Sequence, residues 1–254
     1  MRGTLTQRMR MLAMSVAGVM ILAGAQAQQG GDLQAQILYA FDTGDLNALA
    51  ELQSRLRAAA AASPADPGTR YHLAHADFRL AQLYATSQPH AAAKVLGECI
   101  DMLKPLLAAD GHNVETLILL SRCESALAAT GPLDAVLLRR RADERLSTAL
   151  RLDPHNPRAL LVAALLELGA VGADDGARAR GLSYLRIASE RFTEVSATGT
   201  EAPGWGDSEA WVTLGRQLLK SGDVLGARNW IERALIASPD SQDAHRALAE
   251  LAGH

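Results

Sequence analysis

The stretch from residue 208 to 241 carries a set of spacings that favours a closely packed helix hairpin. The residues that set the spacing are Trp211, Leu214, Gly215, Gly222, Ala227, Ala234 and Pro239. Apolar residues recur at intervals of three and four on both sides of Gly222, which predicts two helices separated by a turn. Gly215 and Ala227 are small enough for the two helices to approach closely, and Pro239 ends the second helix. The stretch therefore predicts an antiparallel pair of helices.

The pattern elsewhere in the chain also predicts short helices. Apolar residues recur at three and four, as in ALAELQSRLRAAAAA and RLSTALRL, and no segment alternates with period two over a strand's length. Signals that stop one helix and start the next, such as DPHNP at 153–157, divide the chain into about ten or eleven helices. Pro105 falls inside a helical pattern, so we expect the helix to kink or end near Lys104. Aromatic residues make up only 4% of the chain, so the core must be built from Ala, Leu and Val.

The spacing at 208–241 recurs in weaker form upstream. The segment ADERLSTALRLDP repeats it with Ala142, Leu146, Ala149 and Pro154. The chain thus resembles the tetratricopeptide-repeat family, whose 34-residue unit is a pair of antiparallel helices, although Leu218 and Ile231 stand where that family usually has aromatic residues. The resemblance implies an all-α, right-handed superhelical solenoid of antiparallel helix pairs over residues 28–254. Its best unit is 208–241, and 242–253 is a closing helix that covers the last unit.

The resemblance also implies where a partner binds. In this family the first helix of each unit lines the concave face of the superhelix. Carried over by position, the implied groove residues are His72, Arg79, Ile118, Arg122, Leu161, Leu165, Val212, Arg216 and Leu219. An apolar floor with several Arg suits an extended or helical peptide that has apolar anchors and an acidic group. The alternative is that Leu161, Leu165 and Leu168 simply contact a neighbouring helix.

The N-terminal residues have the order of a secretory signal peptide. Three Arg and no acid precede the apolar run MLAMSVAGVMILAGA, and the small residues of AQA follow at 25–27. A membrane anchor is the alternative, but a spanning helix needs about 20 apolar residues and this run is shorter. We expect cleavage after Ala27, a periplasmic or secreted mature protein, and no stable membrane insertion afterwards.

Removal of residues 1–27 leaves 22 Lys and Arg against 28 Asp and Glu, a net charge of −6. A mildly acidic chain without a basic stripe lacks the electrostatic driving force for nucleic-acid binding. The two cysteines, Cys99 and Cys123, both lie in the exported part and are each 12 residues from Gly111, the centre of a predicted turn. Their placement suggests a disulfide across a helix hairpin. Two buried thiols are the alternative.

Two further motifs have a chemical and a structural interpretation. His72 and His75 form a His-x-x-His with Asp77 nearby, which binds a metal only if a third ligand arrives, so we expect packed or groove-facing histidines and no metal. The stretch GWGDSEAW could place an anion at a helix N-terminus, but it lacks a phosphate-binding Lys. The simpler interpretation is that Trp205 packs on the last unit.

No arrangement of nucleophile, base or paired carboxylates indicates catalysis, so we expect neither an enzyme nor a bound cofactor. The leading hypothesis is a periplasmic scaffold or adaptor that binds a protein or peptide partner in its groove, in an envelope process. The alternative is a repeat protein that binds a lipid or metabolite and is associated with solute uptake. The sequence does not fix the oligomeric state.

Overall fold

The computed structural model describes residues 33–131, 134–170, 172, 174–198 and 204–253, and every regular element in these ranges is a helix. A helix at 33–42 comes first. It is followed by α2 (Leu46–Ala62), α3 (Pro67–Tyr84), α4 (Pro89–Ala109), α5 (Val114–Ala129), α6 (Ala135–Leu152), α7 (Pro157–Gly169), α8 (Asp175–Thr198), α9 (Asp207–Lys220), α10 (Val224–Ala237) and α11 (Gln242–Ala252). The predicted signal peptide lies outside the described residues.

Short polar side chains start the helices where the sequence has its punctuation. The Asp66 carboxylate accepts hydrogen bonds from the backbone at the start of α3, and Asn113 does the same for α5. Asn156 caps α7, whose first residue, Pro157, needs no hydrogen-bond partner for its nitrogen. These caps satisfy backbone N–H groups that would otherwise lack a partner. The boundaries therefore fall at the predicted stop and start signals.

Consecutive helices form pairs that pack side by side. α3 packs on α4, α5 on α6, α7 on α8 and α9 on α10, while α11 covers the last pair. In the α9–α10 pair, a Cβ at Gly215 would lie 2.6 Å from Ile231 Cγ1 and 3.1 Å from the Ala227 carbonyl oxygen. Gly222, in the turn, has a φ of 85°, which other residues rarely adopt. The expected close approach and turn of the 208–241 unit are confirmed, as is the all-α architecture.

Pro105 does not end its helix. α4 continues through it to Ala109, so of the two expected outcomes near Lys104 the end of the helix is wrong, and the kink stays a prediction. The lost backbone hydrogen bond is offset by packing, because Leu103 is fully buried and Leu106 and Leu107 pack on the same core. One apolar face thus holds the helix together beyond the proline.

A disulfide joins α4 to α5. Cys99 and Cys123 are bonded to each other, both are fully buried, and their Cα atoms lie 6.4 Å apart. The bond connects the second helix of one pair to the first helix of the next. Of the two interpretations of these cysteines, the structure therefore has the bonded one.

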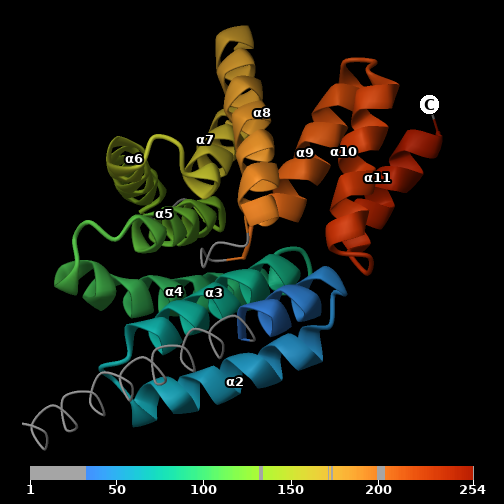
Figure 1. Cartoon of the computed structure of the whole chain (residues 1–254). Coiled ribbons are helices and arrows are strands. Elements are labelled where there is room, and N and C mark those ends of the chain that lie inside the picture. Colours follow the sequence, from blue (N-terminus) through green and yellow to red (C-terminus); the bar gives the residue numbers. More distant parts are fainter. Residues whose placement is uncertain (1–32, 132–133, 171, 173, 199–203, 254) are drawn as a thin grey trace, which may run out of the picture.

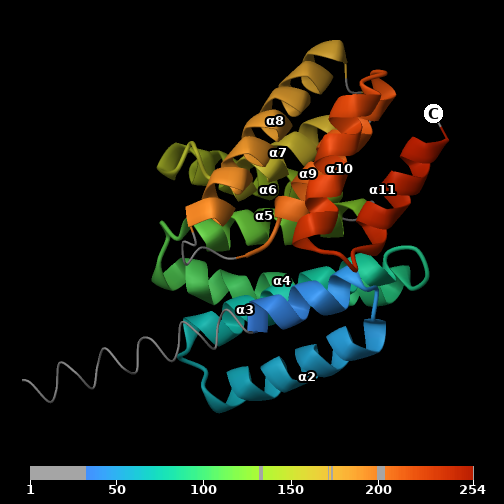
Figure 2. The ribbon, with the colours of Figure 1, turned by 45° about the vertical axis from the view of Figure 1, so that its right-hand side comes forward.

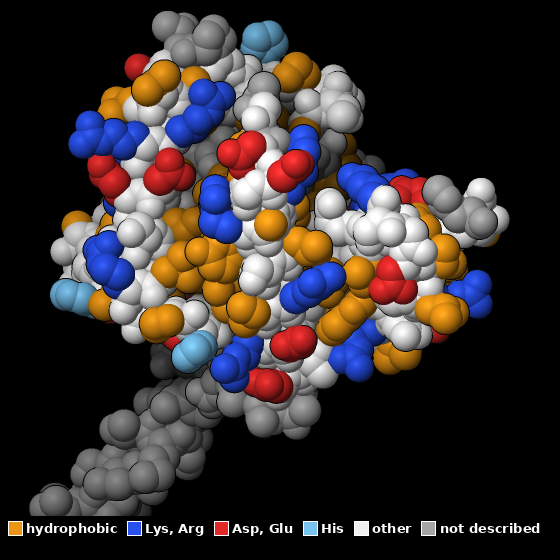
Figure 3. All heavy atoms as spheres, turned by 90° about the horizontal axis from the view of Figure 1, so that it is seen from above, with side chains coloured by type: hydrophobic (Ala, Val, Ile, Leu, Met, Phe, Trp, Pro, Cys, Tyr) orange, Lys and Arg blue, Asp and Glu red, His pale blue; other side chains and the backbone are white. Residues whose placement is uncertain are grey.

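The first and last parts of the solenoid meet. In Figure 1 the helices from α2 to α4 lie across the lower half while α8 to α11 stand above them, and Figure 2 shows the lower end of α11 close to the helix at 33–42. The Ser238 hydroxyl donates to the Asp42 carboxylate at 2.6 Å, and the Gln242 amide donates to the Thr43 carbonyl at 2.5 Å. Seen from above, charged side chains of both signs are interspersed along the ridges, with apolar side chains between them (Figure 3).

Candidate functional site

Three buried arginines mark the face formed by the first helices of the pairs, α3, α5, α7 and α9, which we call the inner face. Arg79 comes from α3, Arg122 from α5 and Arg158 from α7, and their side chains are 3%, 8% and 4% exposed. A guanidinium stays charged when buried and needs a paired acceptor to be tolerated there. The carboxylates paired with these arginines therefore show which side chains occupy the inner face.

Arg158 is paired within the inner face itself. Its Nε donates to Glu115 Oε2 at 2.7 Å and its Nη2 donates to Oε1 at 2.8 Å, in the forked geometry that favours arginine over lysine. Asn156 adds a third hydrogen bond to the same carboxylate at 3.0 Å. This pair joins α7 to α5.

Glu209, in the first turn of α9, is paired with both remaining arginines. Arg122 donates to its two carboxylate oxygens at 2.9 and 2.6 Å, and Arg79 donates to Oε2 at 3.4 Å. Burial alone would raise the pKa of Glu209, but the charges and hydrogen bonds of Arg122 and Arg79 outweigh it and lower the pKa to about 2. One ionised carboxylate thus links α9 to α3 and α5.

Trp205, four residues earlier, fills the space beside this carboxylate. It is only 1% exposed, its indole Nε1 donates to the Tyr71 hydroxyl at 2.9 Å, and its ring stacks on that of His75 at 5.6 Å. The guanidinium carbons of Arg122 and Arg158 lie 5.7 and 5.9 Å from the indole ring. Trp205 therefore contacts α3, α5 and α7 together. The expectation that it packs on the last unit is wrong, because the inner face offers it a hydrogen-bond acceptor and two cations.

His75 supports the indole as a neutral ring. Burial lowers the pKa of His75 well below its ordinary value, and the nearby Arg79 charge lowers it further. Arg79 Nε donates to His75 Nε2 at 3.2 Å, while the Gln34 side-chain amide lies 3.1 Å from Nδ1. Both ring nitrogens of His75 thus have polar neighbours, and the ring packs against Trp205.

Gly206 lets the chain enter this space. Its φ of 104° lies in the region that favours glycine, and a Cβ there would be 2.9 Å from the Phe192 ring and 3.2 Å from Leu161. Unlike α3, α5 and α7, α9 begins without a side-chain cap. We call the segment 204–209 the inner segment. Its backbone conformation and its close approach to Phe192 and Leu161 both require the glycine at 206.

The predicted groove residues all lie on the first helices, but most of them are already covered. Ile118 and Leu161 are fully buried, Val212 is 2% exposed and Leu219 is 8% exposed. Ile118 packs in the same core cluster as Trp205, and the other three belong to the C-terminal core. In this arrangement they contact neighbouring helices, as the alternative interpretation of Leu161 expects, and their contact with a partner stays a prediction. His72 and Leu165 are partly exposed, and their role in binding stays a prediction.

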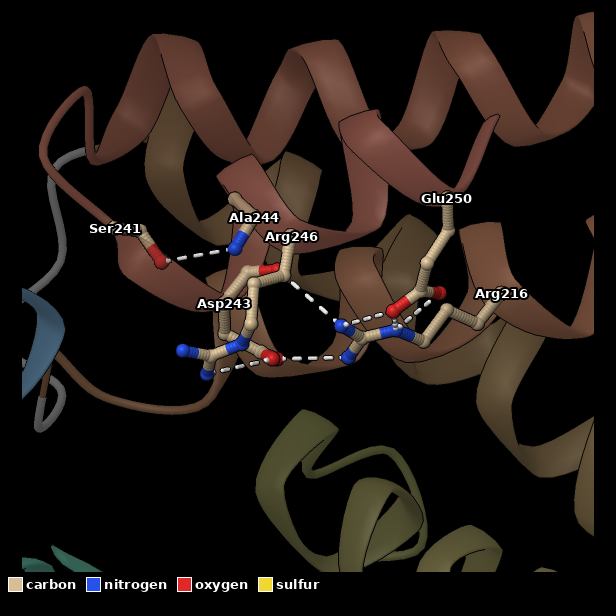
Figure 4. A network of polar contacts seen from close by, with 6 residues as sticks. All are labelled: Arg216, Ser241, Asp243, Ala244, Arg246 and Glu250. Carbon is tan, nitrogen blue, oxygen red and sulfur yellow. Dashed lines mark hydrogen bonds and ion pairs between the residues drawn. The ribbon is translucent and has the colours of Figure 1, made fainter. Parts of the chain in front are cut away.

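Arg216 points to the closing helix instead of an open groove. Its Nη1 donates to Asp243 at 3.0 Å and its Nε donates to Glu250 at 3.0 Å, both on α11 (Figure 4). Its second terminal nitrogen also donates to the Asp243 carbonyl at 3.3 Å. Arg216 is therefore paired with α11 in this structure, and its role in partner binding stays a prediction.

An open pocket of about 660 Å³ lies where the two ends of the solenoid meet. Its walls are the helix at 33–42, α3, the inner segment, the α10–α11 turn and the start of α11. Five acids of the described ranges line it: Asp42, Asp207, Glu209, Asp240 and Asp243. Arg79 and Arg246 are its lining bases. Burial raises the pKa values of Asp42 and Asp207, and the Asp42 charge raises that of Asp207 further. The pocket is acidic, and Tyr39, 63% exposed, stands in its wall.

Two other kinds of site, a metal centre and a membrane-spanning helix, were sought in the described part of the chain. No group of three or more His, Cys, Asp and Glu there is placed to hold a metal ion. Within the same ranges, no helix has both the length and the apolar composition needed to cross a bilayer. The inner face and the pocket are the candidate sites.

Comparison with known proteins agrees with the geometry. The family model of the tetratricopeptide repeat matches residues 208–251. A thermophilic tetratricopeptide protein of Thermus thermophilus is similar in structure, with a TM-score of 0.60 and 19% identity over 90% of this chain and 100% of that one. The haemophore HusA of Porphyromonas gingivalis has a TM-score of 0.58 and 22% identity over 72% of this chain and 90% of that one. No curated protein matches the sequence. The chain thus carries a tetratricopeptide repeat at 208–251 and has the fold of tetratricopeptide-repeat structures over most of its length.

Proposed function

We propose that this chain is an exported, non-catalytic scaffold that binds a protein or peptide partner in a process of the cell envelope. The observation that carries the proposal is the tetratricopeptide architecture, because stacked helix pairs present extended surfaces for binding other chains. Catalytic groups are not needed for such a role.

The open pocket is the part of this surface where we place the partner. The inner face is filled by the inner segment, whereas the pocket remains accessible between the helix at 33–42 and the α10–α11 turn. Its excess of carboxylates and the exposed ring of Tyr39 suit a partner segment with a Lys or Arg side chain next to an apolar one. A basic partner segment would also relieve the repulsion between Asp42 and Asp207.

Export is part of the same proposal. The predicted signal peptide at 1–27 directs the chain to the periplasm, and the Cys99–Cys123 disulfide supports an oxidising compartment. The mass of the mature protein purified from the periplasm tests this, since cleavage after Ala27 gives a chain that starts at Gln28. A mass that still includes residues 1–27 would contradict it.

Partner capture tests the binding role. Crosslinking in the periplasm is compared for the wild type, for a Tyr39→Ala/Asp240→Lys variant in the pocket, and for a Leu225→Ala/Glu232→Lys control on exposed positions outside it. We expect the pocket variant to lose capture by about tenfold or more and the control to retain it. Equal capture by both variants would remove the pocket from the proposal, and no specific crosslink for the wild type would overturn the binding role.

A small-ligand binder is the second candidate, and the pocket volume favours it, because about 660 Å³ lies within the range of ligand sites. The structural neighbour HusA is described as a haemophore. Among the residues that the structure describes, the lining of this pocket contains no His, Met or Cys and is acidic, so it suits a neutral or cationic metabolite better than the carboxylates of a porphyrin. Native mass spectrometry of the purified protein separates the two candidates, since a retained small molecule favours the second.

A further inference from the structure

We infer that the inner segment is an internal ligand of the inner face, and that the partner competes with it by presenting an aromatic ring followed, four residues later, by a carboxylate. This inference rests on the proposed binding function and names the chemistry of the partner. On this inference, the structure is the self-occupied form, in which the inner segment fills the inner face.

The inner segment crosses the inner face as a bound peptide would. The other connections between pairs, at 110–113, 153–156 and 238–241, are short and supply a helix cap. Between α8 and α9 the chain departs from this pattern and sends Trp205 and Glu209 into the inner face. These two side chains contact residues from three consecutive pairs: Tyr71, His75 and Arg79 on α3, Arg122 on α5 and Arg158 on α7. The repeat itself does not require an insertion of this composition.

The charges on the inner face define the acidic half of the competing motif. Two buried guanidiniums, those of Arg79 and Arg122, share the single carboxylate of Glu209. Arg122 holds it in a fork, whereas the Arg79 contact is longer, at 3.4 Å. An incoming carboxylate therefore meets an arginine that is only loosely paired with the internal one.

The aromatic half is defined by the surroundings of Trp205. A flat ring at this place stacks on His75 and lies near the guanidiniums of Arg122 and Arg158, and a ring N–H or O–H can donate to the Tyr71 hydroxyl. Large aromatic side chains in such desolvated positions dominate the affinity of most interfaces. An aliphatic anchor would gain neither the stacking nor the cation contacts.

The pocket gives the partner a route to this place. Gly204, Gly206 and Glu209 of the inner segment line it, and so does Arg79. A partner segment seated in the pocket thus lies directly against one edge of the inner segment.

The first test uses the wild-type protein and hydrogen exchange of two indole N–H groups. Those of Trp205 and Trp211 are both buried, and each donates to an oxygen, of Tyr71 and Ser189 respectively. If the inner segment opens locally, the Trp205 indole exchanges at least about tenfold faster than the Trp211 indole, which belongs to the separate C-terminal core. Equal protection would mean that the segment leaves only on global unfolding, and would overturn the inference.

The second test uses a synthetic peptide with the chain's own residues 204–212 as the probe. We expect it to bind a Trp205→Ala variant at least about tenfold more tightly than the wild type, in which the site is occupied. Peptides in which alanine replaces the residue equivalent to Trp205, or glutamine that equivalent to Glu209, should lose that binding. A Trp230→Ala variant, changed on α10, is the matched control and should behave as the wild type.

The inference would be overturned if the Trp205→Ala variant has native helicity but does not bind the peptide. It would also be overturned if this variant binds all the peptides with equal affinity. If the variant does not fold, the exchange measurement on the wild type decides. Should the inference fail while capture still depends on Tyr39 and Asp240, the proposed function stands and only the internal ligand is lost. Loss of the proposed function would instead appear as absence of specific capture by the wild type.

Discussion

Replacing Glu209 by glutamine removes the one charge that holds α9 against α3 and α5. The carboxylate is 24% exposed, and the two arginines hold its pKa at about 2, against 4.5 ordinarily, although burial opposes this. That difference corresponds to about 3 kcal/mol of folding free energy at neutral pH. Glu209→Gln leaves Arg79 and Arg122 with a neutral acceptor, so we expect a loss of about 3 kcal/mol at pH 7.

The pH dependence follows from the direction of the pKa change. Because the pKa of Glu209 is lower in the folded state, its contribution is present above about pH 4.5 and disappears as the pH falls towards 2. The gap between wild type and variant should therefore shrink to about 1 kcal/mol near pH 3. Urea unfolding followed by circular dichroism measures the free energy of unfolding of both proteins at the two pH values.

The matched control is Glu194→Gln on α8. Glu194 pairs with Arg191 at 2.8 Å, but its side chain is 62% exposed, and a surface pair contributes about 0.5 kcal/mol or less. If Glu209→Gln and Glu194→Gln cost the same within about 0.5 kcal/mol, the assignment of Glu209 as a buried anchor is refuted. The same holds if the effect of Glu209→Gln does not diminish at low pH.

Three further predictions concern the scaffold. Burial raises the pKa of Asp77 to about 7, so ionisation of this carboxyl lowers the free energy of unfolding as the pH rises from about 4 through 7. Asp77→Asn should remove this pH dependence and raise the free energy of unfolding by roughly 2–4 kcal/mol at pH 8, as measured by urea titration. Gly215→Ala should lose about 1–3 kcal/mol and lower the melting temperature, because its Cβ would clash with the partner helix, whereas Gly97→Ala, with open space around it, should gain about 0.5–1 kcal/mol. Removing the disulfide by changing Cys99 and Cys123 to Ser should lower the free energy of unfolding by about 3 kcal/mol, given a separation of 24 residues, as measured by denaturation of the two proteins in parallel.

Most of the fold could be predicted from the sequence because its signals are local. Helix starts depend on residues such as Asn113 and Asn156, whose side chains bond backbone groups two or three positions away. The pairing of α9 and α10 depends on small residues at 215 and 227, which lie within one unit. Pro105 was the exception, since whether a helix survives a proline depends on packing that the sequence around it does not show.

The candidate site was predictable only in part. The repeat spacing places Arg79, Arg122 and Arg216 on the first helices, where the structure has them, but it cannot say what they touch. Arg122 and Arg79 meet Glu209 across 87 and 130 residues of sequence, and Tyr71 meets Trp205 across 134. No local pattern encodes such distances. The available signal was GWGD itself, because a tryptophan between two glycines in an insertion needs a place in which to be buried.

The position of the Trp205 ring tests the central claim most directly, because that claim is that the chain fills its own inner face. Nuclear Overhauser measurements on the mature protein, with Trp211 and Trp230 replaced by Phe, report which protons surround the remaining indole. We expect cross-peaks from the indole N–H to the ring of Tyr71 and from the indole ring to His75, as their contacts in the structure require. Cross-peaks only to residues of α9 and α10, or an indole without long-range neighbours, would contradict the self-occupied inner face.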